Sequence, residues 1–178
     1  FAEAGAVVTP VKPFLTREMI DGLDRFWRAR GWEDVRKLGP QDQAKILPYI
    51  FQWIETASGF SGRDVYTGFA QIEAMRNALG AALEGLDYML SPTAPTPSYP
   101  AEWPSPVNDP QKPFEHIGFT VAANMGGQPA ISINCGYAPD GLPIGLQIIG
   151  QPFDDLGVLR VARAYEQMRP AQRPWPTL

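Results

Sequence analysis

A proline-dense stretch between Pro92 and Pro113 limits this chain's folding more than any other feature, because it holds eight of the chain's 19 prolines. Each proline lacks a backbone N–H donor and disfavours helical backbone in the residue before it. The stretch is therefore predicted to be an extended loop. Loops of this length inside a compact domain are usually functional or disordered.

Apolar residues recur at helical spacing before the loop. One helix is predicted from Arg17 to Arg30, capped by Thr16 and ended by Gly31. A second apolar stripe covers residues 46–54, with Pro48 at its start or at a kink.

Three further helices are predicted from the same signals. The first is long and runs from the capping residue Ser61 to Glu84. A short helix spans Ile117–Met125 and ends at a pair of glycines. The last runs from Asp154, a plausible N-cap, to Met168, and the tail beyond it, which holds three prolines, is predicted to be irregular.

Nearly continuous apolar runs predict buried strands. The runs are Ala6–Val11, Leu86–Ser91, Ala130–Cys135 and Ile144–Ile149. Such runs fit a sheet that is covered on both faces and paired at its edges. Together with the helices they predict an α/β fold, a mixed sheet flanked by helices.

Composition narrows the function. A chain of 178 residues can form one domain with a real core, and its net charge of −4 argues against direct nucleic-acid binding. No apolar run approaches the length of a membrane span, so no membrane association is expected. The single cysteine excludes an internal disulfide and leaves the cytoplasm as the default compartment.

The chain lacks a complete set of residues for nucleophilic catalysis. It has no G-x-S-x-G elbow and no S-x-x-K pair, and its one histidine and one cysteine cannot build a zinc site, so no metal is expected. Cys135 and His116 could form a dyad. The competing interpretation is that Cys135 is a small apolar strand residue and His116 a loop residue.

Carboxylates and aromatic rings are concentrated in or beside the loop. Glu102, Asp109 and Glu115 could do acid–base work if two of them met, but solvated loop charges are the simpler interpretation. The rings of Tyr99, Trp103 and Phe114 could line an apolar pocket or fasten the loop to the body of the protein.

Two polar side chains lie in otherwise apolar segments. Asn124 could satisfy backbone groups at a helix end or hold the wall of an active site. Gln147 is expected to be a buried amide with hydrogen-bond partners, and structural anchoring is favoured over substrate contact.

Three linked motifs resemble the C-terminal portion of the amidase signature family. They are Asp87-Tyr-Met-Leu-Ser-Pro-Thr93, Phe119-Thr-Val-Ala-Ala-Asn124-Met-Gly-Gly127-Gln-Pro129-Ala and Gly141-Leu-Pro-Ile-Gly145-Leu-Gln147-Ile-Ile-Gly150. The resemblance runs from about Ala2 to Met168, and Arg76 and Glu166 also fit it. It implies a mixed sheet flanked by helices, and a hydrolase of linear amides that uses a serine, a second serine in a cis peptide and a lysine, with no cofactor.

The glycine- and serine-rich segment and the lysine of that family have no counterpart here, so no catalytic residue is predicted. Residues 1–178 are interpreted as the C-terminal portion of a single amidase-signature domain, with the loop at 92–116 inside it. This chain is predicted to be inactive alone and to be completed by an upstream half. The last turn of a helix at Ala2–Gly5 and the absence of an initiator methionine favour this interpretation.

A small amide is the expected ligand, and a homodimer is possible. Because loops at strand ends commonly bind ligands, the predicted substrate-binding residues are Thr93, Tyr99, Trp103, Phe119 and Asn124. Two alternatives stay open. The chain could belong to the amidase subunit of a transfer-RNA-dependent amidotransferase, or it could be a stand-alone binding module without catalysis.

Overall fold

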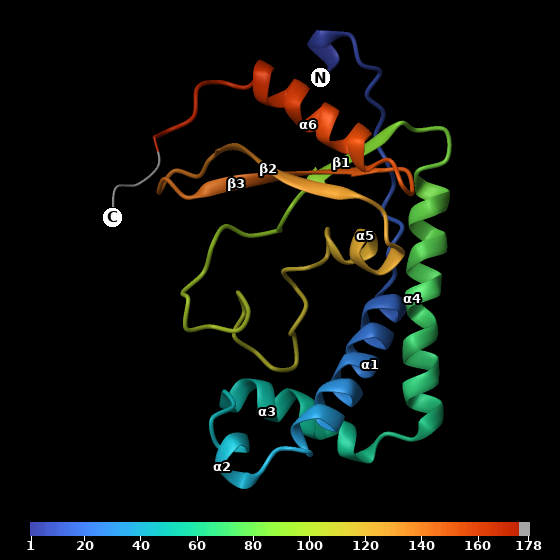
Figure 1. Cartoon of the computed structure of the whole chain (residues 1–178), viewed down its shortest axis with the longest axis vertical. Helices are drawn as coiled ribbons and strands as arrows, with labels where there is room; N and C mark the ends of the chain where they lie inside the picture. The colour runs from blue at the N-terminus through green and yellow to red at the C-terminus, as the bar shows by residue number, and fades with distance from the viewer. Residues whose placement is uncertain (175–178) are drawn as a thin grey trace.

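A computed structural model describes residues 1–174 of the chain. In chain order its elements are η1 (Ala2–Ala4), α1 (Arg17–Val35), α2 (Pro40–Gln43), α3 (Pro48–Glu55), η2 (Thr56–Gly59), α4 (Gly62–Ala82), β1 (Tyr88–Pro92), α5 (Val121–Gly126), β2 (Ala130–Tyr137), β3 (Pro143–Gly150) and α6 (Asp155–Met168). The strands and α6 form a sheet layer at one end of an elongated molecule, and α1 to α4 form a helical arm that extends from it (Figure 1).

The three strands form one antiparallel sheet in the order β1-β3-β2. In this register Met89 lies opposite Ile149 on one side of β3, and Ser132 lies opposite Gln147 on the other. The register shifts between Asn134 and Gly136, which leaves Cys135 in a bulge. The predicted α/β class is confirmed, and the strands within residues 1–174 pair only antiparallel.

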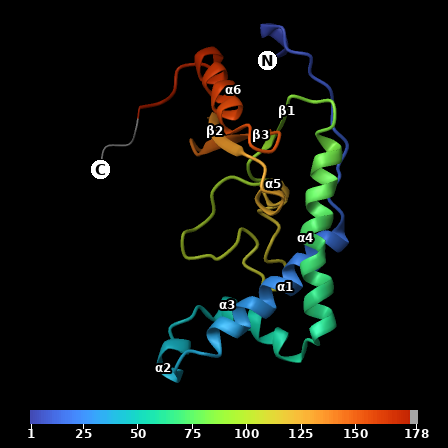
Figure 2. The ribbon, with the colours of Figure 1, turned by 45° about the vertical axis from the view of Figure 1, so that its right-hand side comes forward.

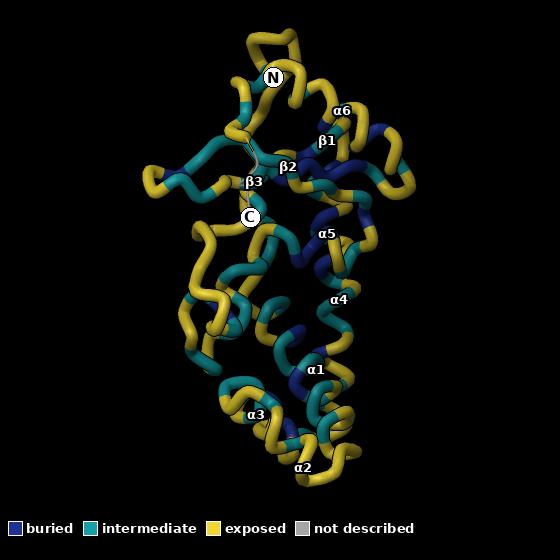
Figure 3. The backbone as a smooth tube through the Cα atoms, turned by 60° about the vertical axis from the view of Figure 1, so that its left-hand side comes forward, coloured by how far each residue is buried: buried dark blue, intermediate teal, exposed yellow. Residues whose placement is uncertain are grey.

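The two faces of the sheet are covered by different helices. Helix α6 lies on one face, while α5 and the end of α4 lie on the other (Figures 1 and 2). Ile148 and Ile149, which as strand neighbours point to opposite faces, are 0% and 2% exposed. The main core cluster consists of Leu79, Leu83, Met89, Ala122, Ala123 and Ile149. Figure 3 shows the buried backbone concentrated in this layer and along α1 and α4.

Glycines allow α1 and α4 to cross closely. A Cβ added at Gly68 of α4 would lie 2.6 Å from the carbonyl oxygen of Gly22 in α1. Leu23, Met75 and Val121 form a second buried cluster beside this crossing. The helical arm is therefore packed directly onto α5, which carries Val121 and links the arm to the sheet layer.

The predicted helix caps are confirmed. The Ser61 hydroxyl accepts a hydrogen bond from the Asp64 N–H at 3.2 Å, and the Asp64 carboxylate accepts one from the Ser61 N–H at 2.9 Å. These hydrogen bonds from Ser61 lower the pKa of Asp64. Thr16 and Asp154 likewise accept bonds from the third backbone N–H beyond them.

The predicted strand at Ala6–Val11 is wrong. This segment has no regular structure, and Val7 and Val8 are 94% and 59% exposed. Pro10 removes a ladder donor, and no strand within residues 1–174 pairs with the segment. The apolar run alone could not form a strand because a strand needs a hydrogen-bonded neighbour.

Three helix boundaries also differ from prediction. Helix α1 continues past Gly31 to Val35, because Gly31 is a close-packing position whose added Cβ would lie 2.9 Å from Ile54 Cγ2. Residues 117–120 form hydrogen-bonded turns, so α5 begins only at Val121. The long helix α4 ends at Ala82, two residues before the predicted Glu84. Residues 170–174 are irregular as predicted, and the rest of the predicted irregular tail lies outside the described residues.

Candidate functional site

A hollow of about 230 Å³ lies where the proline-rich loop leaves β1, between α5 and the sheet. We call it the sheet hollow. Its lining consists of Thr93, Thr120, Ala123, Asn124, Gln128, Ala130, Ile131, Ser132 and Gln147. None of these side chains carries a charge at neutral pH, so the sheet hollow offers hydrogen bonds and apolar contact without a counter-charge.

A pair of hydroxyl groups lies in the wall of the sheet hollow. Thr93 Oγ1 and Ser132 Oγ are 2.6 Å apart, and the Thr93 N–H donates to the carbonyl of Gly145 at 2.9 Å. A Cβ added at Gly145 would lie 2.6 Å from Thr93 Oγ1 and 3.0 Å from Ser132 Oγ. Glycine at position 145 therefore leaves room for the two hydroxyls to meet across β3.

The amide of Gln147 fixes the start of α5 to the sheet. Its Nε2 donates to Ser91 Oγ at 2.9 Å and to the carbonyl oxygen of Phe119 at 2.8 Å. Gln147 is only 4% exposed, so these bonds satisfy a donor that is shielded from water. The expectation of an anchored, buried amide is confirmed.

The structure brings two of the predicted substrate-binding residues, Thr93 and Asn124, together in the sheet hollow. Asn124 is exposed, and its Nδ2 donates to the carbonyl of Thr120 at 2.9 Å, so it also braces α5. Phe119 adjoins the hollow through its fixed carbonyl, and its residue is 40% exposed. Tyr99 and Trp103 lie in the loop, 37% and 42% exposed, and do not line the hollow.

Aromatic packing fastens the far end of the loop to the helical arm. The Phe114 ring meets Trp27 edge-on at a centroid distance of 4.9 Å and Trp53 at 5.6 Å. Of the two roles considered for the loop aromatics, Phe114 therefore has the fastening role. Tyr99 packs edge-on against His116 at 6.2 Å.

Arg28 is a buried charge that the sequence interpretation missed. It is 8% exposed, its Nε donates to Asp24 Oδ2 at 2.8 Å, and its guanidinium also reaches the carbonyl of Pro110 in the loop at 3.4 Å. Further bonds join it to the Trp53 carbonyl and the Thr56 hydroxyl. The available signal was the Asp24–Arg28 spacing of four residues on a tryptophan-bearing helix.

A second polar contact holds the same part of the loop. The Tyr49 hydroxyl donates to the carbonyl of Asp109 at 2.9 Å and lies 3.0 Å from the hydroxyl of Ser105, which is 1% exposed. The loop is thus anchored by α1 and α3 at residues 105–114 and by the sheet at Thr93. The segment between these anchors carries Tyr99 and Trp103.

The structure does not pair Cys135 with His116. Cys135 lies in the bulge of β2, whereas His116 packs beside Tyr99, and no hydrogen bond joins the two within residues 1–174. His116 Nδ1 is buried without a partner among these residues, and burial lowers the pKa of the imidazole. The geometry gives the dyad no support.

The loop carboxylates are also separated. Glu115 lies 3.8 Å from Arg17, and Asp109 accepts a hydrogen bond from the Gln111 N–H at 2.9 Å. No hydrogen bond links Glu102, Asp109 and Glu115 to one another in the described part of the chain. Nor does any group of three or more His, Cys, Asp or Glu side chains within residues 1–174 come together in a way that could hold a metal ion.

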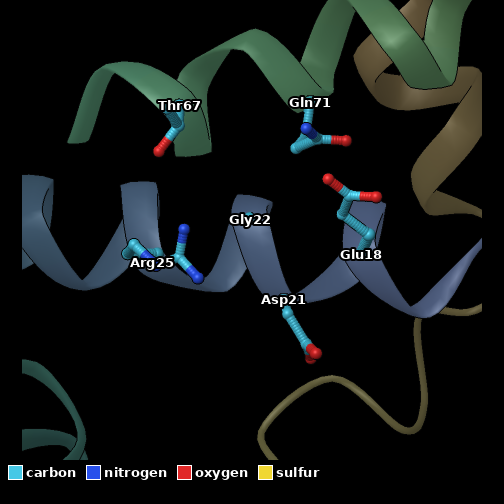
Figure 4. A pocket seen from close by; sticks show the side chains of 6 residues that line it. All are labelled: Glu18, Asp21, Gly22, Arg25, Thr67 and Gln71. Atoms are coloured by element: carbon cyan, nitrogen blue, oxygen red, sulfur yellow. The ribbon is translucent and has the colours of Figure 1, made fainter. Parts of the chain in front are cut away.

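A larger hollow, about 480 Å³, lies between α1 and α4, and we call it the arm hollow. Figure 4 shows Thr67 and Gln71 projecting from α4 toward α1, Glu18 reaching toward Gln71, and Asp21 pointing away from α4. Arg25 completes a lining rich in charge. Its walls are two helix surfaces, and Glu18, Asp21 and Thr67 are exposed, so its charged groups are in contact with water.

A sheet packed between helices, with a loop and a polar hollow at the strand ends, defines a protein of the α/β class. The family model named Amidase matches residues 9–159. The chain therefore belongs to the amidase family, and it shares the fold of the amidase-signature enzymes.

Known relatives extend well beyond the matched region. The A subunit of glutamyl-tRNA(Gln) amidotransferase from Thermodesulfovibrio yellowstonii is 41% identical over 104 residues, which cover 58% of this chain and 21% of that protein. The same subunit from Desulforapulum autotrophicum is 40% identical, with 97% of this chain and 36% of that protein covered. The chain thus spans well under half the length of these relatives.

A solved structure of 6-aminohexanoate cyclic dimer hydrolase complexed with substrate has the same fold. It matches with a TM-score of 0.79 and 21% identity, over 96% of this chain and 39% of the hydrolase chain. Among the described residues, no helix is both long and apolar enough to cross a bilayer.

Proposed function

We propose that this chain forms one wall of the substrate pocket in an amide-bond hydrolase whose serine nucleophile comes from an upstream segment. The observation that carries the proposal is the sheet hollow, an uncharged and hydrogen-bonding cavity at the strand ends of an amidase-family fold. Within residues 1–174 Cys135 and His116 do not meet, so this pair offers no nucleophile activated by a base. The chain is the C-terminal portion of one domain and works in the cytoplasm without a cofactor.

The substrate is a linear amide, and five residues contact it. Thr93 and Asn124 line the sheet hollow, and Phe119 is fixed beside it by Gln147. Tyr99, which packs against His116, and Trp103 lie on the loop between its two anchors, and we propose that both rings contact a substrate that enters from the loop side. Wall residues of this kind select among acyl or amine groups.

Activity measurements test the proposal directly. The 178-residue chain should not hydrolyse simple aliphatic or aryl amides, because activation needs a nucleophile within reach of its base. The complete protein with its upstream segment should hydrolyse them. Turnover by the chain alone that disappears in Cys135→Ala would contradict the proposal.

A second measurement tests the loop. Trp103→Ala in the complete protein should change the ratio of kcat/KM between small and bulky amides, because the proposal assigns Trp103 a contact with the substrate. Phe114→Leu is the control for loop anchoring and should alter stability more than this ratio. An unchanged ratio in Trp103→Ala would leave Trp103 as a loop anchor.

A second candidate function rests on the relatives named as the A subunit of glutamyl-tRNA(Gln) amidotransferase. In that case the complete protein would release ammonia from glutamine for a partner subunit. Glutamine-dependent amidation that requires added partner subunits, with little hydrolysis of aryl amides, would favour this candidate. An active homodimer without partners would favour the hydrolase.

A further inference from the structure

Gln128 stands out in the sheet hollow because it is buried and incompletely hydrogen-bonded. It is 8% exposed, it lines the hollow, and its Oε1 has no hydrogen-bond partner within residues 1–174. The other buried amide in the lining, Gln147, has two acceptors for its Nε2. A buried carbonyl oxygen without a partner costs free energy, so Gln128 gains from any ligand donor that reaches it.

The two polar ends of the Gln128 carboxamide are nearly equal in shape. The carboxamide rests against the backbone of Gly126, where an added Cβ would collide with Oε1. The terminal torsion of glutamine is broad, and a half-turn about it exchanges the oxygen and the NH₂ group. Gln128 can therefore present either an acceptor or a donor to the hollow.

We infer that Gln128 is a specificity-determining residue whose carboxamide pairs with a neutral amide of the bound ligand. A primary amide offers both a donor and an acceptor, which matches what Gln128 presents. The lining has no charged side chain, so a carboxylate or an ammonium group at the same place would lose its hydration without a counter-charge. The inference rests on the proposed function for its choice of ligand class, but it concerns binding and needs no turnover.

Ligand titration of the 178-residue chain by NMR tests this inference. The probes are butyramide, butyrate and butylammonium, which share a carbon chain and differ in the polar head. The wild-type chain should bind butyramide at least about tenfold more tightly than either ion, because a buried charge without a partner is strongly disfavoured. Binding of butyrate or butylammonium as tight as that of butyramide would overturn the inference.

Three variants locate the effect at Gln128. Gln128→Met keeps the length of the side chain and should weaken butyramide binding about five- to tenfold, as expected for one lost hydrogen bond. Gln52→Met is the matched control, since Gln52 is exposed on α3, and it should leave binding unchanged. Equal butyramide affinity in the wild type and Gln128→Met would contradict the inference.

Gln128→Glu, the third variant, guards against loss of folding as an explanation. It places a carboxylate in the hollow and should reverse the preference, so that butylammonium binds more tightly than butyramide. A poorly folded protein cannot show such a reversal. If this chain binds butyramide but the complete protein hydrolyses no amide, the proposed function alone is rejected. If the complete protein hydrolyses amides and Gln128→Met does not change the rate, this inference alone is rejected.

Discussion

Arg28 in the helical arm and Gln147 in the sheet layer are both buried polar side chains, 8% and 4% exposed, and each ties a loop segment to the body of the protein. Arg28 does so with a charge, which is paired with Asp24 and also reaches the Pro110 carbonyl. Gln147 does so with a neutral amide bound to Ser91 and Phe119.

The two hollows differ in the same way. The arm hollow includes Glu18, Asp21 and Arg25 among its walls, and the sheet hollow has no ionisable wall residue. The difference teaches that size alone did not decide which hollow we propose as the substrate site. The smaller hollow contains the buried, incompletely bonded amide and adjoins the loop, whereas the larger one is a charged seam between two helices.

Removing the buried charge of Arg28 from the helical arm should have the largest effect on the free energy of unfolding. Arg28→Ala leaves the Asp24 carboxylate, the Pro110 carbonyl of the loop and the Trp53 and Thr56 oxygens without this donor, so we expect a loss of about 3–5 kcal/mol in the free energy of unfolding. Urea denaturation followed by circular dichroism measures it. Arg17→Ala breaks exposed pairs with Asp21 and Glu115 and should cost under about 1 kcal/mol. Similar costs for both variants would remove the distinction between buried and exposed charge.

A carboxyl group introduced into each hollow should lower the stability of the protein by different amounts. Ala123→Asp places a carboxyl group where the residue is 3% exposed, and we expect a loss of about 3 kcal/mol in unfolding free energy. Thr67→Asp places the same group in the exposed arm hollow and should change stability by no more than about 0.5 kcal/mol. Thermal unfolding of both proteins checks the pair. A small cost for Ala123→Asp would mean that position 123 is as accessible to water as position 67.

Removing the neutral anchor of the sheet layer should have a smaller effect than removing Arg28. Gln147→Met keeps the side-chain length but leaves the Phe119 carbonyl and the Ser91 hydroxyl without this donor, which should cost about 2 kcal/mol. Urea denaturation measures the loss, and Gln52→Met on the exposed face of α3 is the control. A loss of unfolding free energy equal to that of Arg28→Ala would mean that the charge of Arg28 does not make it a stronger anchor than the neutral amide of Gln147.

The smallest expected effect is a pH dependence from His116. Burial lowers its pKa in the folded state, so the unfolded chain binds a proton more readily. The stability of the neutral form is present above about pH 6.5 and is lost as pH falls through the folded pKa. His116→Gln should therefore flatten the fall in Tm between about pH 7.5 and pH 5. An unchanged slope would assign the acid sensitivity to other groups.

Local signals predicted the elements well where the decisive interactions are close in sequence. Ser61, Thr16 and Asp154 predicted three helix starts, because a capping side chain reaches only the next turn. The strands at 130–135 and 144–149 were found through the turn between them. The run at Ala6–Val11 failed because a strand depends on a distant partner, which periodicity cannot reveal.

The candidate site was predictable only in part for the same reason. The motif resemblance identified Thr93 and Asn124, which the structure brings together in the sheet hollow. Gln128, inside a quoted motif, and Arg28, inside a predicted helix, were both overlooked. Their significance comes from burial and from partners or their absence, and these depend on tertiary contacts.

The strand order has a consequence for synthesis on the ribosome. Strand β3, which pairs with both β1 and β2, is the last of the three to be translated, and the 51 positions from Pro92 to Pro143 separate it from the end of β1. At about 5–20 residues per second, β1 waits on the order of 3–10 s for β3, its partner among residues 1–174. The proline-rich loop emerges during this interval, and its prolines hinder the nascent chain from extending β1 into a non-native ladder.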